Sequence, residues 1–421
     1  MSAEKGYGHG HGGHGMGTLR LEEARAKIFA ALKPITTTER VAVRQALGRV
    51  LGADVISTLN VPAHTNSAMD GYAVRSVDLP SSGAKDFREI GSALAGHPFD
   101  GVVGANQCVR IMTGGVVPRG ADTIVIQEDV SVSDAGVHIG IGHPPGQHVR
   151  KAGEDLAVGA TVLRKGRRLT PADLGLIASL GIAEVTVLRR LRVAFFSTGD
   201  ELRSLGEPLG DGDIYDSNRY TLYGMLTRIG AEILDLGVVR DDPEVMRGVL
   251  ERAATDADAV LTSGGVSVGV ADYVKTVLAQ VGSVGFWKVK MKPGKPIAFG
   301  RFNSGAAFFG LPGNPVSSMV TYYQVVQPAL DLLAGSEPRL PLALQVPTSE
   351  ALDKLPGRRE FQRGCLETHP DGSLTVRSAA PQGSGILRSM SLADCFIVLP
   401  EDSGPVPAGT LVRVEPFAGF M

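Results

Sequence analysis

The sequence predicts a multidomain α/β plus β protein, and three observations support this fold class. A chain of 421 residues has too much surface for one core and should divide into about three domains. Between residues 191 and 338, strand-like and helix-like segments alternate, which is typical of βαβ units in a mostly parallel, doubly wound sheet. Residues 60–149 and 339–421 instead carry short apolar runs between turn residues, which indicates β-rich domains.

These patterns divide the chain into five segments. The first is a flexible tail, the second a small mixed α/β domain built from two stretches, and the third a β-rich domain inserted between those stretches. An α/β domain and a C-terminal β-barrel-like domain follow. Their expected bounds are 1–17, 18–59 with 150–190, 60–149, 191–338 and 339–421.

Composition excludes several classes of protein. The 54 glycines follow no G-X-Y period, which excludes collagen, and 43 per cent hydrophobic residues with a net charge of -2 exclude a disordered chain. The near-zero charge argues against nucleic-acid binding. No apolar run reaches about 18 residues and no secretory signal begins the chain, so no membrane span is expected. Three distant cysteines favour a reducing, cytoplasmic location.

Helical spacing of apolar residues sets the expected helices. A helix is expected at 21–32, where Pro34 ends the run, and a second one after Thr37 or Thr38 that would carry Val41 and Leu47. Further helices are expected at 169–180, 218–229, 243–254, 273–281 and 315–333, the last kinked at Pro328. Strands are expected between them, at 183–188, 193–196, 232–236, 259–262, 286–291, 296–302 and 306–309.

The most informative loop is the glycine-rich segment 262–269, which follows an expected strand and precedes an expected helix. Such a loop turns backbone N–H groups toward an anion, and the helix N-terminus adds a favourable dipole. The loop lacks the G-K-[ST] sequence of a nucleotide-binding P-loop, so it predicts another kind of phosphate site. A tight turn without a ligand is the alternative.

Carboxylates and cations follow the ends of neighbouring strands. Glu201 follows one strand and Asp272 follows the glycine-rich loop, and hard oxygen ligands beside a phosphate are what Mg²⁺ requires. Lys292 and Lys295 lie in a stiff Pro-Gly turn, and Ser317 lies at the start of a helix. Together these three residues predict an oxyanion cradle, with a solvated basic turn as the alternative.

Recognisable motifs run in order from residue 62 to residue 394. They are PAHTNSAMDGYAV (62–74), IMTGGVVPRGADTIVIQED (111–129), VRKAGED (149–155), STGDEL (197–202), IYDSNR (214–219), TSGGVSVGVADY (262–273), KPGKP (292–296), FGLPGNPVSS (309–318), EFQRG (360–364) and QGSGILRSM (382–390). The set resembles the molybdopterin molybdenumtransferase family, which includes the MoeA proteins and the E domain of gephyrin. The departures are Val270 in place of a common Glu and Asp394 in place of Asn.

The resemblance implies a reaction and its partners. Molybdate would be inserted into the dithiolene of adenylylated molybdopterin with release of AMP, assisted by Mg²⁺. The family forms homodimers with the active site at the dimer interface. A molybdopterin adenylyltransferase would act upstream, and a molybdoenzyme or cofactor carrier would receive the product. Molybdate and tungstate are not distinguished by the sequence.

The resemblance also carries site residues onto this chain. The functional acids fall on Asp70, Asp155, Glu201 and Asp272, and the metal ligands on Glu201, Asp241 and Asp272. The molybdate cradle falls on Lys292, Lys295, Pro296, Ser317, Arg363 and Ser384, with Arg358, Arg359 and Ser389 as neighbouring competitors. The cofactor-binding residues are Thr113, Gly114, Ser197, Thr198, Gly199, Ser263, Gly264, Gly265, Ser267, Pro312, Gly313 and Pro315.

Two other functions compete with this reading. The α/β domain also resembles molybdopterin adenylyltransferases, so adenylylation of molybdopterin from ATP is the runner-up. A gephyrin-like scaffold without turnover is the second alternative. The tail residues His9, His11 and His14 fit a loose metal site or simply a flexible segment, and the sequence assigns them no function.

Overall fold

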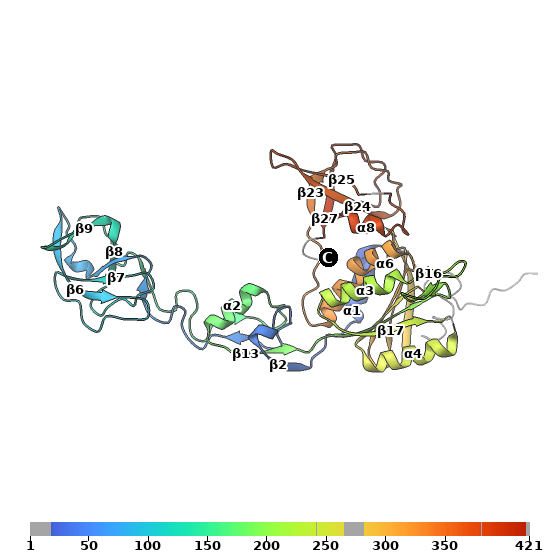
Figure 1. The fold of residues 1–421 in the computed structure, drawn as a ribbon, viewed down its shortest axis with the longest axis horizontal. Coiled ribbons are helices and arrows are strands. Elements are labelled where there is room, and N and C mark those ends of the chain that lie inside the picture. The colour runs from blue at the N-terminus through green and yellow to red at the C-terminus, as the bar shows by residue number, and fades with distance from the viewer. Residues whose placement is uncertain (1–17, 241, 265–281, 380, 418–421) are drawn as a thin grey trace, which may run out of the picture. The chain divides into compact units, whose positions relative to one another are not determined.

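The chain forms two compact units in a computed structural model that describes residues 18–240, 242–264, 282–379 and 381–417 (Figure 1). The first unit comprises the described parts of 1–39, 48–50 and 187–421, and the second comprises 40–47 and 51–186. Each unit has its own sheets and its own core. The predicted α/β plus β architecture is confirmed, whereas the finer five-segment division stays a prediction.

A seven-stranded sheet is the centre of the first unit. Two of its inner strands, at residues 192–198 and 259–263, carry long apolar runs and are almost completely buried, as strands covered on both faces must be. Four of the six pairings are parallel, and the two pairings of the strand at residues 296–302 are antiparallel. In spatial order the strands are β1 (Thr18–Leu19), β19 (Gly282–Val289), β21 (Pro296–Phe302), β22 (Ala307–Leu311), β18 (Ala259–Ser263), β14 (Arg192–Thr198) and β17 (Glu232–Val239).

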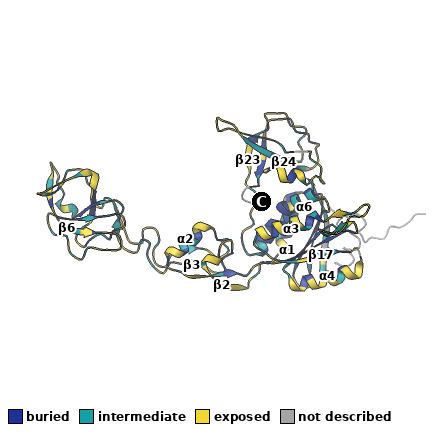
Figure 2. Cartoon of the chain, viewed as in Figure 1, coloured by how far each residue is buried: buried dark blue, intermediate teal, exposed yellow. Residues whose placement is uncertain are grey.

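Helices cover both faces of this sheet, as the alternation of the sequence predicts. Phe195 of β14 packs in the core shared with α1 (Leu21–Ala31) and α3 (Ser217–Arg228), while its neighbour Phe196 packs with α4 (Pro243–Asp256) on the other face. Figure 1 shows α4 on the side of the sheet opposite to α1, α3 and α6. Exposed residues alternate with buried ones along α4 (Figure 2). The helix expected at 273–281 lies outside the described residues.

The long helix expected at 315–333 is present but interrupted. It consists of α6 (Pro315–Thr321), a π-helical turn η4 (Tyr322–Val326) and α7 (Gln327–Leu333). The π turn ends just before Pro328, whose ring cannot donate a backbone hydrogen bond. The interruption predicted at Pro328 therefore takes the form of a π-helical turn on its N-terminal side.

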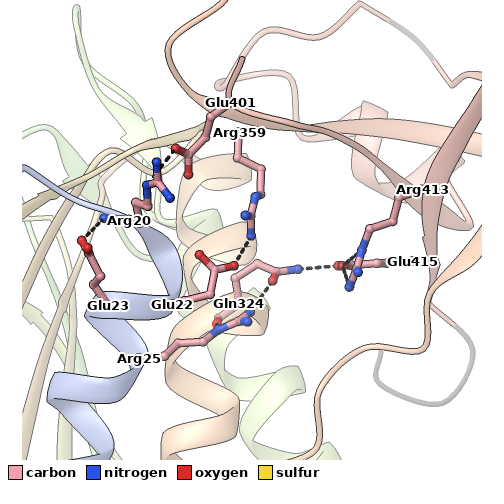
Figure 3. Close-up of polar contacts among 9 residues, drawn as sticks. All are labelled: Arg20, Glu22, Glu23, Arg25, Gln324, Arg359, Glu401, Arg413 and Glu415. Atoms are coloured by element: carbon pink, nitrogen blue, oxygen red, sulfur yellow. Dashed lines mark hydrogen bonds and ion pairs between the residues drawn. The ribbon is translucent and has the colours of Figure 1, made fainter. Parts of the chain in front are cut away.

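Helix α1 packs with the α/β sheet, although the sequence pattern grouped 18–59 with 150–190. Its buried face, Leu21, Ala24 and Ile28, belongs to the same core as β14 and α6. Arg25 donates hydrogen bonds to the backbone and side-chain oxygens of Gln324, and Gln324 Nε2 donates to Glu415 at 2.8 Å (Figure 3). This network joins the N-terminal helix, the π turn and the C-terminal sheet within one unit.

The C-terminal segment forms a mixed six-stranded sheet. Its first strand, β20 (Met291–Lys292), comes from the α/β region and pairs in parallel with β24 (Arg359–Thr368). This pairing fixes the lysine turn beside the C-terminal sheet. The remaining members are β26 (Cys395–Leu399), β27 (Leu411–Pro416), β23 (Leu344–Pro347) and β25 (Leu374–Ser378), with the short helix α8 (Arg388–Leu392) nearby in sequence.

The second unit contains the β-rich insert and short flanking elements. A six-stranded sheet has the order β8 (Thr123–Ile126), β5 (Gly71–Val74), β7 (Gln107–Ile111), β6 (Lys85–Ala93), β10 (Gly136–Ile139) and β9 (Val130–Ser133). Helix α2 (Pro171–Ser179) is capped by Thr170, whose hydroxyl accepts from the Asp173 amide. The short strands are β3 (Val55–Ile56), β4 (Asn66–Ser67), β11 (Val149–Arg150), β12 (Thr161–Leu163) and β13 (Glu184–Leu188).

The second helix expected near the N-terminus is wrong. The chain forms strand β2 (Thr38–Ala42) and a single 3₁₀ turn (Val43–Gln45) there. Ala46 is buried but Leu47 is 54 per cent exposed, so the apolar spacing does not mark one buried helical face. The β-branched residues of this segment favour extended backbone.

None of the described helices is both long enough and apolar enough to cross a membrane. The three cysteines are free thiols, and two of them, Cys108 and Cys395, are buried in the cores of separate β domains. Burial raises the pKa of the Cys108 thiol to about 12, with a smaller contribution from Glu89. These two cysteines therefore act as small core residues.

Candidate functional site

A pocket of about 640 Å³ lies in the first unit, at the carboxyl ends of the parallel strands. Ligands of open α/β sheets bind at this edge. The lysine turn after β20 and a loop of the C-terminal domain close its other side. The described lining is Thr198, Glu201, Leu202, Ile214, Tyr215, Asp216, Ser217, Asn218, Ser263, Gly264, Lys292, Pro293, Gly294, Lys295, Pro296, Pro312, Gly313, Asn314, Pro315, Ser317, Arg358, Gln382, Gly383 and Ser384.

The loops after β14, β18 and β22 touch one another at the floor of this pocket. Gly264 has a φ of +92°, and a Cβ at this position would lie 2.5 Å from the carbonyl oxygen of Thr198. The Gly264 amide donates to the Leu311 carbonyl at 3.1 Å. Only glycine combines this left-handed backbone with so close an approach. The glycine-rich loop predicted to face an anion therefore packs tightly beside two other strand ends.

Glu201 is the described member of the predicted metal set, and it is exposed on the pocket lining. Its carboxylate folds back over Gly199, where an added Cβ would lie 2.7 Å from Glu201 Oε2. Hard carboxylate oxygens suit Mg²⁺, which takes one or two carboxylates together with substrate phosphates. Among the residues that the structure describes, no cluster of three His, Cys, Asp or Glu side chains forms a complete metal site.

The residues predicted to form an oxyanion cradle lie near one another around the lysine turn. Lys292, Lys295 and Pro296 line the pocket together with Ser317 of α6, which is 5 per cent exposed. The Lys292 ammonium forms an ion pair with Glu360, whose side chain is buried. Since β20 pairs with β24, backbone register holds this pair together. Lys295 is exposed, so its ammonium is available to an anion at the pocket.

Arg363 and Ser384 occupy different positions in this wall. Ser384 lines the pocket, as does Arg358, one of the two neighbouring arginines that the sequence left in competition. Arg363 is 1 per cent exposed, and its guanidinium donates to Ser389 Oγ at 3.0 Å and to the Gly383 carbonyl at 3.1 Å. Burial lowers the pKa of Arg363 to about 10, with Glu360 opposing the shift. Arg363 thus supports the pocket loop from beneath.

Asp70 and Thr113 lie together in the second unit. The Thr113 amide and hydroxyl both donate to Asp70 Oδ1, each at 2.7 Å. These backbone and side-chain hydrogen bonds hold the pKa of Asp70 below its ordinary value. The structure therefore places two of the predicted residues, Asp70 and Thr113, in direct contact.

Two further predicted residues also lie in the second unit. Gly114 has a φ of +80°, and the Asp155 amide donates to the Val61 carbonyl at 3.0 Å.

Replacement of Thr113 by valine tests its contact with Asp70. The Thr113→Val variant loses the hydroxyl donor but keeps the amide donor, so the pKa of Asp70 should rise part of the way toward its ordinary value. The Asp70 carboxylate is favoured in the folded state at neutral pH, and that preference is lost as pH falls through its lowered pKa. Carboxyl-carbon NMR titration measures the shift; an unchanged Asp70 titration would contradict the assignment.

Several predicted residues cannot be placed at the pocket. Asp241, Gly265, Ser267 and Asp272 lie outside the described residues. Ser197 is fully buried in β14, directly before the lining residue Thr198.

The pocket also contains residues that the sequence reasoning did not select. Asp216, Asn218, Gln382 and Gly383 line it. These residues belong to the IYDSNR and QGSGILRSM motifs, which the sequence already identified. Which residues of each motif line the pocket could be seen only in the folded structure.

Three family models match consecutive parts of the chain. The MoeA N-terminal region (domain I and II) matches residues 19–181, the probable molybdopterin binding domain matches 194–332, and the MoeA C-terminal region (domain IV) matches 345–417. The matches follow one another in chain order and leave only short stretches outside them.

Curated relatives and solved structures agree with these models. A molybdopterin molybdenumtransferase of Haemophilus influenzae is 44 per cent identical over 401 residues, which cover 95 per cent of this chain and 98 per cent of that protein. Molybdopterin molybdenumtransferase 2 of Mycobacterium tuberculosis is 40 per cent identical, with 92 and 96 per cent covered. A crystal structure of the molybdopterin biosynthesis MoeA protein from Pyrococcus horikoshii superposes with a TM-score of 0.81 at 28 per cent identity, covering 95 per cent of this chain and all of that one. The chain belongs to the MoeA family, the molybdopterin molybdenumtransferases.

Proposed function

We propose that this protein inserts molybdate into the dithiolene of adenylylated molybdopterin, with release of AMP and formation of the molybdenum cofactor. The observation that carries the proposal is the pocket itself. It combines two lysines and an arginine with glycine-rich strand-end loops and one exposed carboxylate. The cations suit a tetraoxo dianion, and the loops suit a nucleotide phosphate.

The residues divide between binding and orientation. Lys292 and Lys295 would hold the oxyanion beside Ser317 and Ser384, which offer hydroxyl donors. The loops at Thr198, Gly264 and Gly313 would receive the pterin and nucleotide part. The proposed reaction inserts the oxyanion at the two dithiolene sulfurs and cleaves the phosphoanhydride that holds AMP. Positioning both substrates in one site would supply much of the catalysis of such a reaction.

Mg²⁺ is part of the proposal. Glu201 would contribute a ligand, and Asp241 and Asp272 are the further candidates from the sequence. When bound, the ion would stabilise the negative charge of the departing phosphate. Asp70 and Asp155 would also contribute to the reaction, because they lie in family motifs that carry functional acids.

We further propose a cytoplasmic homodimer. Apolar and aromatic side chains are exposed at Leu205 and Leu209, in β16 (Ile214–Tyr215) and in α3, where Tyr215, Tyr220 and Tyr223 are 43 to 50 per cent exposed. A surface of this kind fits an interface between copies of the chain. An adenylyltransferase would supply the substrate, and a molybdoenzyme or carrier would accept the product.

The decisive experiment is an AMP-release assay. Purified protein is incubated with adenylylated molybdopterin and Mg²⁺, with molybdate, with tungstate or without oxyanion, and AMP is measured by chromatography. AMP release that requires an oxyanion is the expected result. A parallel incubation of bare molybdopterin with ATP tests adenylylation; turnover there, without oxyanion-dependent AMP release in the first assay, would replace the proposed reaction by its runner-up.

A further inference from the structure

Asn218 lies at the start of α3, between two of the loops that line the pocket. The residue is 9 per cent exposed. The helix begins at Ser217, and Asp216 caps it by accepting from the Arg219 amide at 3.1 Å. The cap fixes the first turn, and therefore fixes the direction in which Asn218 projects.

Both hydrogen bonds donated by the Asn218 amide group go to these loops. Nδ2 donates to Ser263 Oγ at 2.7 Å, at the end of β18, and to the Gly313 carbonyl at 2.7 Å, in the turn between β22 and α6. In the sequence, Ser263 is 45 positions and Gly313 is 95 positions from Asn218. One side chain therefore ties a helix N-terminus to two strand-end loops that each contribute to the pocket.

The loops that Asn218 joins are already in contact through their backbones. The Gly264 amide donates to the Leu311 carbonyl at 3.1 Å, and a Cβ at Gly264 would lie 2.5 Å from the Thr198 carbonyl oxygen. The close approach at Gly264 leaves little room for compensating movement when one link is removed. Displacement of the Ser263 hydroxyl or the Gly313 carbonyl would thus move the floor of the pocket.

We propose that Asn218 is a positioning residue, which holds the Ser263–Gly264 and Pro312–Gly313 loops in register to receive the pterin-nucleotide substrate. The inference rests on the proposed function, because it names the part of that substrate which these loops hold. Asn218 acts through the loops. The lysine turn that receives the oxyanion has its own support from Glu360.

Because Asn218 supports the loops and Glu360 supports the lysine turn, the KM for adenylylated molybdopterin and the KM for molybdate should respond differently to loss of Asn218. In Asn218→Leu, which keeps the side-chain size but loses both donors, KM for adenylylated molybdopterin should rise and kcat/KM should fall by about 10- to 100-fold, the usual effect of removing an orienting partner. KM for molybdate should stay within about twofold. Asn303→Leu, in the exposed turn after β21, is the matched control and should behave as wild type.

A double-mutant cycle with Ser263→Ala separates this role from a general loss of stability. Because Asn218→Leu has already removed the link, Ser263→Ala should cost less in that background than in the wild type. Hydrogen exchange of peptides covering 259–264 and 311–314 should be faster in Asn218→Leu, whether or not the protein turns over. Additive kinetic effects with unchanged exchange would overturn the proposal, as would equal changes in both Michaelis constants. Absence of AMP release by wild type would instead overturn the proposed function.

Discussion

Replacement of Lys292 and Lys295 together by alanine is expected to abolish molybdate-dependent AMP release. Hydrogen bonds to charged groups contribute about 1.5–3 kcal/mol each, so loss of both corresponds to roughly 10²- to 10⁴-fold in kcat/KM for molybdate. The physical reason is that a dianion entering the pocket loses its hydration and needs compensating cations. Equilibrium dialysis with molybdate alone should show the same loss of binding.

The control for this variant is a charge-matched one. Lys288 and Lys290 lie close in sequence but outside the pocket lining, so Lys288→Ala with Lys290→Ala removes the same net charge and should leave turnover near wild type. Because Lys292 is paired with buried Glu360, its loss also affects stability, and the single Lys295→Ala variant provides a test without that contribution. Full activity of Lys295→Ala and of the double variant would remove both lysines from the site.

Substitution of Gly264 by alanine should have the second large effect. An alanine there must adopt a φ of +92°, which costs about 1–2 kcal/mol, and its Cβ would lie 2.5 Å from the Thr198 carbonyl oxygen. Backbone cannot rotate away as a flexible side chain can, so the loops after β14 and β18 must separate. We expect kcat/KM to fall by about 10²-fold or more, since misplacement by about 1 Å is sufficient for such a loss.

Gly409→Ala separates the conformational cost from the clash. Gly409 has a φ of +81° but nothing within 4 Å of the added Cβ. Both variants should lower the free energy of unfolding, measured with urea, but only Gly264→Ala should lose AMP release. Equal activity of the two variants would show that the contact between the loops does not matter for turnover.

Sequence patterns predicted most of the helices and strands, because the interactions that form these elements act between residues close together in the chain. Helices α1, α3 and α4 appear within one or two residues of their expected bounds, since apolar spacing and caps act over a few residues. The segment at 38–47 was misread because its spacing imitates a helix while its β-branched residues favour a strand. The membership of α1 in the α/β core could not be predicted, because it depends on contacts with residues about 300 positions away.

The sequence by itself determined the family, the order of the motifs and the residue types of an oxyanion and phosphate site. These properties depend on which residue types occur together in short segments of the chain. Only the tertiary structure decided which arginine lines the pocket, since Arg358 and Arg363 are five residues apart but one faces the cavity and the other lies buried beneath it. It also decided the role of Asn218, because a hydrogen bond between residues 95 positions apart exists only once the sheet has brought its strand ends together.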